Sequence, residues 1–100
     1  MKSRYSAYAA GEVNYIIRTT HPEYPERNKD PRLWREEIAY FCRNEHFDGL
    51  EILETMLGER ESYVTFLARL GSGPIKERSR FLLEEGRWLY HSGKLLSQEK

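Results

Sequence analysis

The sequence has 100 residues, of which 39% are hydrophobic, and its 16 basic and 16 acidic side chains give a formal net charge of zero. That length supports one domain with a modest core, and an aromatic content of 13% argues against disorder. A neutral chain has no global field that favours nucleic acid or an anionic membrane, and no apolar run is long enough to span a bilayer.

The single cysteine and the first residues bear on where in the cell the protein is located. Cys42 cannot form an intrachain disulfide, which is typical of a reducing environment, and residues 1–5 contain no apolar signal region. We therefore expect a cytoplasmic protein without a membrane partner. We also expect one domain over residues 1–100, with residues 94–100 forming a frayed tail.

The first part of the chain predicts two helices. Ser3 can cap a helix over residues 4–10, which Gly11 interrupts. A second helix should extend to residue 20 or 21, where Pro22 stops it. Its apolar side chains recur at the spacing of one helix face: Val13, Ile16, Ile17 and Thr20.

The remainder predicts one more helix and a sheet. After a polar loop, Asp30 and Pro31 are typical of a helix cap and first helical residue, and this helix should fade over residues 44–48. Helices followed by strands favour an α+β fold in which the helices cover one face of a twisted, mainly antiparallel sheet. Four strands are expected, over residues 50–57, 63–70, 75–84 and 87–92.

A predicted hairpin places a carboxylate on the core face. Glu85-Gly86 reads as a two-residue loop, and the strands should then pair Glu84 with Arg87, Leu83 with Trp88, Leu82 with Leu89, Phe81 with Tyr90 and Arg80 with His91. Because side chains alternate, Glu77 and Ser79 fall on the same face as Phe81.

This placement has two explanations. One is a structural ion pair between Glu77 and Arg4 or another helix arginine, since buried charges are normally paired. The other is a polar group in a ligand pocket. A bulge in the strand would reverse the alternation and remove the question.

The opposite face of the same strand carries three basic residues: Lys76, Arg78 and Arg80. A solvated surface is the simplest interpretation, with an acidic partner as the alternative. Nucleic acid is a third interpretation, against which the neutral net charge argues. Three leucines among these charges also allow a homodimer interface on the open face of the sheet: Leu67, Leu82 and Leu89.

Other chemistry-bearing residues have structural interpretations. His21 lies at a helix end, where it can cap terminal carbonyls. Tyr5 and Tyr8 can both face the sheet, and buried hydroxyls would need partners, which Glu77 could supply. Cys42 falls on an apolar helix face, as a small buried hydrophobe does. No two histidines have metal-ligand spacing, and there is no Cys-x-x-Cys or phosphate-binding glycine loop, so we expect no metal and no cofactor.

Five short stretches, in this order, resemble the central domain of YchJ-like proteins, a family associated with the SEC-C zinc motif: Arg4-Tyr5-Ser6-Ala7-Tyr8, His21-Pro22, Gly49-Leu50-Glu51-Ile52-Leu53, Glu77-Arg78-Ser79-Arg80-Phe81 and Gly86-Arg87-Trp88-Leu89-Tyr90. The resemblance implies a nuclear-transport-factor-2-like (NTF2-like) cone, with helices packed into the concavity of a curved four-stranded sheet. It brings no established activity.

The sequence also departs from that family. Zinc binding is not carried over, because this chain has one cysteine and lacks the cysteine-rich motifs that typically flank the domain. Thr20 stands where the family often has tryptophan before His-Pro. Phe47 stands near another position, close to Gly49, that is often tryptophan.

These observations favour a non-catalytic accessory or interaction domain, with an unidentified protein partner or a homodimer formed through the open sheet face. The alternative is a small-molecule pocket, or an enzyme like the isomerases and dehydratases found among relatives of the cone fold. Glu77 would then be a general base, with Tyr5 or Tyr8 as hydrogen-bond donor. The candidate pocket residues are Glu77, Ser79, Tyr5, Tyr8 and His21.

Overall fold

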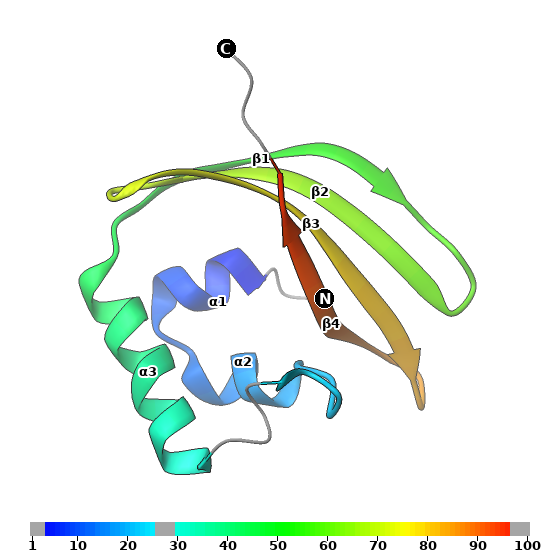
Figure 1. The fold of residues 1–100 in the computed structure, drawn as a ribbon, viewed down its shortest axis with the longest axis horizontal. Coiled ribbons are helices and arrows are strands. Elements are labelled where there is room, and N and C mark those ends of the chain that lie inside the picture. Colours follow the sequence, from blue (N-terminus) through cyan, green and yellow to red (C-terminus); the bar gives the residue numbers. More distant parts are fainter. Residues whose placement is uncertain (1–3, 26–29, 97–100) are drawn as a thin grey trace.

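The computed structural model describes residues 4–25 and 30–96. Helices come first along the chain and strands follow: α1 (Arg4–Ala10), α2 (Val13–Arg18), α3 (Pro31–Asn44), β1 (Phe47–Met56), β2 (Glu61–Leu70), β3 (Gly73–Glu84) and β4 (Arg87–Leu95). Figure 1 shows the helices gathered on one side of the curved sheet, which confirms the predicted α+β arrangement. None of the described helices has the length and hydrophobicity needed to cross a membrane.

Local sequence explains how the helices are separated. α3 starts at Pro31 because the Asp30 side chain accepts a hydrogen bond from the backbone N–H of Arg32 at 2.9 Å, as the Asp-Pro pair predicted. Gly11 separates α1 from α2 in a left-handed conformation with φ of 72°, which glycine adopts readily. The cap predicted at Ser3 lies outside the described residues.

α2 ends at Arg18 rather than at residue 20 or 21, because the chain turns to run beside β4. Thr20 forms a parallel bridge with Tyr90, and the backbone N–H of His21 donates to the Tyr90 carbonyl at 2.8 Å. The Thr20 hydroxyl still donates to the Ile16 carbonyl at 2.7 Å. The residues after α2 therefore lie against the sheet edge.

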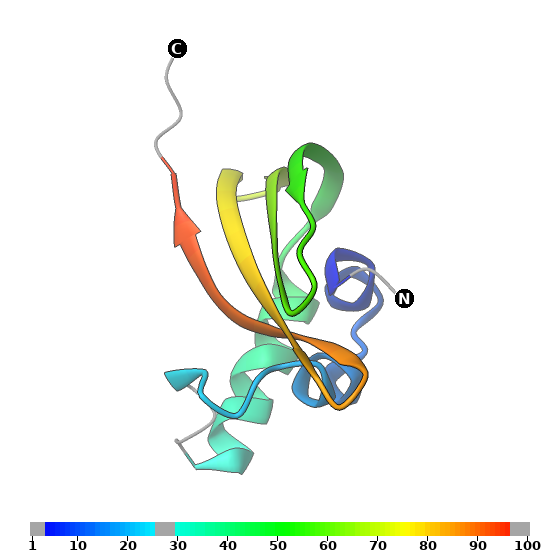
Figure 2. The same ribbon diagram turned by 90° about the vertical axis from the view of Figure 1, so that its right-hand side faces the viewer.

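The four strands form one antiparallel sheet in the order β1-β2-β3-β4. Figure 2 shows its twist and the β3–β4 hairpin curling round at the lower end. The predicted hairpin is confirmed, with Glu84 opposite Arg87. Both loop residues have positive φ, 51° at Glu85 and 81° at Gly86, as a type I′ turn requires.

The register departs from the prediction beyond Tyr90. Arg80 pairs with Ser92 and not with His91, so His91 is an extra, bulged residue in β4. The bulge belongs to β4, and it leaves the alternation along β3 unchanged. Glu77 and Ser79 therefore share the concave face with Phe81, as the sequence predicted.

The outer strands are longer than predicted. β1 begins at Phe47 and β4 continues to Leu95. The prediction of a frayed tail from residue 94 is wrong for Lys94 and Leu95, because both pair with β3. Residues 97–100 lie outside the described part of the chain.

The helices form the main core among themselves. Its buried members come from the three helices and are Ala7, Ile16, Trp34 and Ile38. Cys42 packs against this cluster and is partly buried, in line with its predicted role as a small hydrophobe. Among the described residues this cluster includes none from the concave face of the sheet, and there is room between the helices and the sheet.

Candidate functional site

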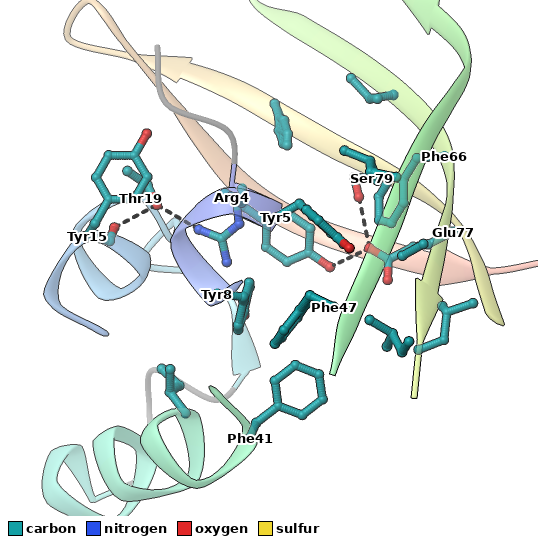
Figure 3. A pocket seen from close by; sticks show the side chains of 18 of the residues that line it. Arg4, Tyr5, Tyr8, Tyr15, Thr19, Phe41, Phe47, Phe66, Glu77 and Ser79 are labelled. Atoms are coloured by element: carbon teal, nitrogen blue, oxygen red, sulfur yellow. Dashed lines mark hydrogen bonds between the residues drawn. The ribbon is translucent and has the colours of Figure 1, made fainter. Parts of the chain in front are cut away.

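That room is a pocket with a volume of about 640 Å³, within the ~300–1,000 Å³ range of small-molecule sites. Side chains from all three helices and all four strands line it, as Figure 3 shows in part. Aromatic rings dominate the lining and meet edge to face, Tyr5 with Phe47 at 5.6 Å and Phe41 with Phe47 at 5.8 Å between centroids. Such a wall suits a flat, apolar ligand.

The structure brings four of the five sequence-predicted candidates into this lining: Glu77, Ser79, Tyr5 and Tyr8. His21 is not among the lining residues. It is buried beside the end of the β3–β4 hairpin, where its Nε2 lies 2.9 Å from Glu84 Oε2. Its Nδ1 accepts the backbone N–H of Glu23 at 3.0 Å, so His21 caps a turn rather than the helix carbonyls that we expected.

Glu77 is held by hydroxyl groups. The Ser79 hydroxyl donates to Glu77 Oε2 at 2.8 Å, and the Tyr90 hydroxyl donates to the same oxygen at 3.1 Å. Sequence reasoning did not assign Tyr90 to this site, although the predicted Phe81–Tyr90 pair already placed Tyr90 on the face that carries Glu77.

The predicted ion pair between Glu77 and Arg4 does not form. Arg4 Nη1 donates to Thr19 Oγ1, just after α2, at 2.7 Å and to the carbonyl of Ile16, in the second half of α2, at 3.2 Å. The Arg4 guanidinium lies 4.6 Å from the centroid of the Tyr90 ring, a cation–π distance. Among the described residues no basic side chain forms an ion pair with Glu77.

One carboxylate oxygen of Glu77 is therefore left for a ligand. Both hydroxyl bonds go to Oε2, and Oε1 accepts none of the hydrogen bonds within the described residues. In that part of the chain no fully buried side-chain nitrogen or oxygen lacks a partner, so Oε1 is not fully buried, and Glu77 lines the pocket.

Gly93 makes this arrangement possible. It pairs with Ser79 across the β3–β4 ladder. A Cβ atom at residue 93 would overlap Glu77 Oε2 and the Tyr90 hydroxyl, and it would lie 2.7 Å from Glu77 Cδ. The absence of a side chain at this position lets the carboxylate and the phenol meet over the strand.

The tyrosines differ in environment. Burial, and then the charge and hydrogen bond of Glu77, raise the pKa of Tyr90 far above its ordinary value. Burial also raises the pKa of Tyr8, against the lowering effect of Arg4. The Tyr5 hydroxyl accepts the backbone N–H of Gly49 at 2.7 Å. The Tyr90 hydroxyl thus stays protonated and donates to Glu77.

The outer face of the sheet carries charges that pair with one another. Arg80 is bonded to Glu61, whose other donor is the Tyr63 hydroxyl at 2.6 Å. Arg78 lies over the Tyr63 ring, 4.5 Å from its centroid. The hydrogen bonds from Tyr63 and Arg80 lower the pKa of the Glu61 carboxyl. This pairing agrees with a solvated surface.

The fold and pocket define an NTF2-like domain: helices enclose the concave face of a curved sheet and leave a pocket there. The chain belongs to the YchJ family, because residues 1–93 match that family's middle NTF2-like domain. This confirms the resemblance drawn from the short stretches of sequence.

Relatives support the same assignment. The chain is 40% identical to a UPF0225 protein of Pectobacterium carotovorum and 38% identical to one of an Enterobacter species, over 93% of its own length in both cases. It spans 63% and 62% of the length of those two proteins. The solution structure of a SEC-C motif containing protein from Rhodopseudomonas palustris superposes with a TM-score of 0.78 and 28% identity, covering 94% of this chain and 73% of that one.

Proposed function

We propose that the domain binds a small organic molecule in the concave pocket, with Glu77 Oε1 as the polar anchor. The observation that carries this proposal is a carboxylate with a free, accessible oxygen at an aromatic-lined cavity of about 640 Å³. A carboxylate accepts hydrogen bonds only, so the ligand must present a donor there. The aromatic walls favour an apolar, preferably aromatic, body.

A protonated amine or amidine on an aromatic body fits best. Glu77 carries no ion pair within the described chain, so a cationic ligand would supply the missing counter-charge. The Arg4 guanidinium already lies over the Tyr90 ring, so the positive group of a ligand would bind beside Glu77 instead. An anionic group at the same point would be repelled by the carboxylate.

The test compares three probes with the same aromatic body: 2-phenylethylamine, the neutral 2-phenylethanol and the anionic 3-phenylpropanoate. We expect the amine to shift the backbone amide signals of Phe66, Ala68 and Ser79 in NMR titrations, and the carboxylate to shift none of them. A screen in which no probe perturbs these amides, or in which all three bind equally, would refute the proposal.

Glu77→Gln is the matching variant. The amide oxygen can still accept both hydroxyl bonds, while the amide nitrogen replaces Oε1 with a donor. Binding of the amine should weaken by about tenfold or more, since a lost charge-assisted hydrogen bond is worth roughly 1.5–3 kcal/mol. Glu51→Gln serves as a control, because Glu51 lies on the outer face, paired with Arg69.

Catalysis through Glu77 has less support than binding. The two hydroxyls nearest the carboxylate donate to it and are not free to hold a reacting oxygen. An interaction role through the open sheet face is the second candidate. There Leu67 and Leu82 are only partly buried among paired charges. Sedimentation equilibrium over a wide concentration range tests it, and a strict monomer would rule out the homodimer.

A further inference from the structure

Three residues with metal-ligating side chains meet outside the pocket, at the edge where the segment after α2 runs along β4. They are His21, Glu23 and His91, and one ligand atom of each lies within 4.8 Å of the other two. His91 is the bulged residue of β4, and bulges commonly redirect a side chain toward a site. The wide gap in sequence between His21 and His91 explains why no ligand spacing was visible.

Each histidine has one ring nitrogen held by a neighbour. His21 Nε2 lies 2.9 Å from Glu84 Oε2, and His91 Nδ1 lies 3.0 Å from the Ser92 hydroxyl. Metal-binding histidines characteristically bond their second nitrogen to a carboxylate or another polar group, which fixes the ring. The remaining nitrogens, His21 Nδ1 and His91 Nε2, are both bonded to Glu23, the first to its backbone N–H and the second to its Oε1, each at 3.0 Å.

We propose that His21, Glu23 and His91 bind a divalent transition-metal ion, with Zn²⁺ as the best match. Two imidazoles and one carboxylate form the donor set of an open zinc site, in which water takes the fourth position. His21 would bind through Nδ1, because Glu84 engages Nε2, and the Glu23 backbone N–H would give up its present bond to Nδ1. The ion would replace hydrogen-bonded contacts that already hold the three residues together.

The geometry needs one movement. Bonds of about 2.0–2.2 Å to a tetrahedral zinc place ligand atoms roughly 3.4 Å apart, closer than the widest separation here. Glu23 can adjust most easily, because its side chain is 69% exposed, whereas the His91 side chain is 19% exposed and that of His21 is 8% exposed. One buried ring, one partly buried ring and an adjustable carboxylate form a site that is largely preformed.

Zinc titration of the untagged chain by calorimetry tests the proposal, with Co²⁺ absorption to report coordination geometry. We expect one ion per chain. Glu23→Gln and His91→Gln should each weaken binding at least tenfold, the order of loss known even for outer-shell partners. His46→Gln is the matched control, since His46 is an exposed histidine just before β1, and it should bind like the wild type.

Folding of each variant is checked by its NMR amide spectrum. The exposed Glu23 and the partly buried His91 are chosen so that buried His21 need not be altered. Loss of zinc binding in Glu23→Gln and His91→Gln, with retention in His46→Gln, would support the site. Equal binding by all variants, loss in His46→Gln, or no heat at millimolar Zn²⁺ would overturn it. None of these outcomes depends on the pocket ligand.

Discussion

Gly93 offers the sharpest test of the polar group in the pocket. In Gly93→Ala the new methyl would overlap Glu77 Oε2 and the Tyr90 hydroxyl and approach Glu77 Cδ to 2.7 Å. Both side chains must move, and their mutual hydrogen bond at 3.1 Å must lengthen or break. Overpacking of this kind costs about 1–3 kcal/mol, offset by about 0.4–1 kcal/mol from the stiffer unfolded chain.

Gly49→Ala is the matched control, another glycine within a strand. A Cβ there would meet only Arg69 Cδ, at an ordinary 3.7 Å, so its stability should be unchanged or slightly raised. The two variants should differ by about 2 kcal/mol in the free energy of unfolding, or roughly 8–16 °C in melting temperature, by urea and thermal denaturation. In the Glu77→Ala/Tyr90→Phe background the cost of Gly93→Ala should largely vanish. If Gly93→Ala is as stable as Gly49→Ala in the wild-type background, the placement of Glu77 and Tyr90 is wrong.

Two titrations probe other contacts. Burial and the Glu77 charge raise the pKa of Tyr90 above its ordinary 10.0, so the stability that this phenol contributes is complete below about pH 10 and is lost above it. In urea unfolding, the free energy of unfolding should therefore fall more steeply at alkaline pH for the wild type than for Tyr90→Phe. Parallel declines would contradict this. The hydroxyl and the backbone N–H of Ser72 donate hydrogen bonds to the Glu45 carboxylate, at 2.8 and 3.0 Å respectively, and these bonds lower the Glu45 pKa. Ser72→Ala should therefore raise that pKa in an NMR carboxyl titration. An unchanged titration midpoint would disprove the contact.

Local signals made much of the fold predictable. Asp30 and Pro31 determine the start of α3 by capping and by fixed φ, both of which depend on neighbouring residues alone. Glu85-Gly86 fixes the last hairpin, and alternation from that turn placed Glu77 and Ser79 on the concave face. Short-range rules sufficed wherever the controlling interactions were themselves short-range.

The partners of Glu77 could not be predicted in the same way. Arg4 has the right charge for an ion pair, but its guanidinium instead bonds residues at the end of α2. That choice depends on how α1 packs against α2, which no local pattern encodes. His21 was assigned to the pocket for a similar reason: nothing near Pro22 indicates that the chain turns to pair with β4.

The bulge at His91 links the two proposed sites through one register. Without it, alternation from the hairpin would place Ser92 opposite Ser79, on the concave face. A serine Cβ there would meet the same overlap that excludes alanine at residue 93, so Glu77 and Tyr90 could not come together. With the bulge, Gly93 takes that place and His91 is left as the extra residue beside His21. One additional residue in β4 therefore opens the carboxylate site on the concave face and supplies a ligand to the proposed metal site at the edge.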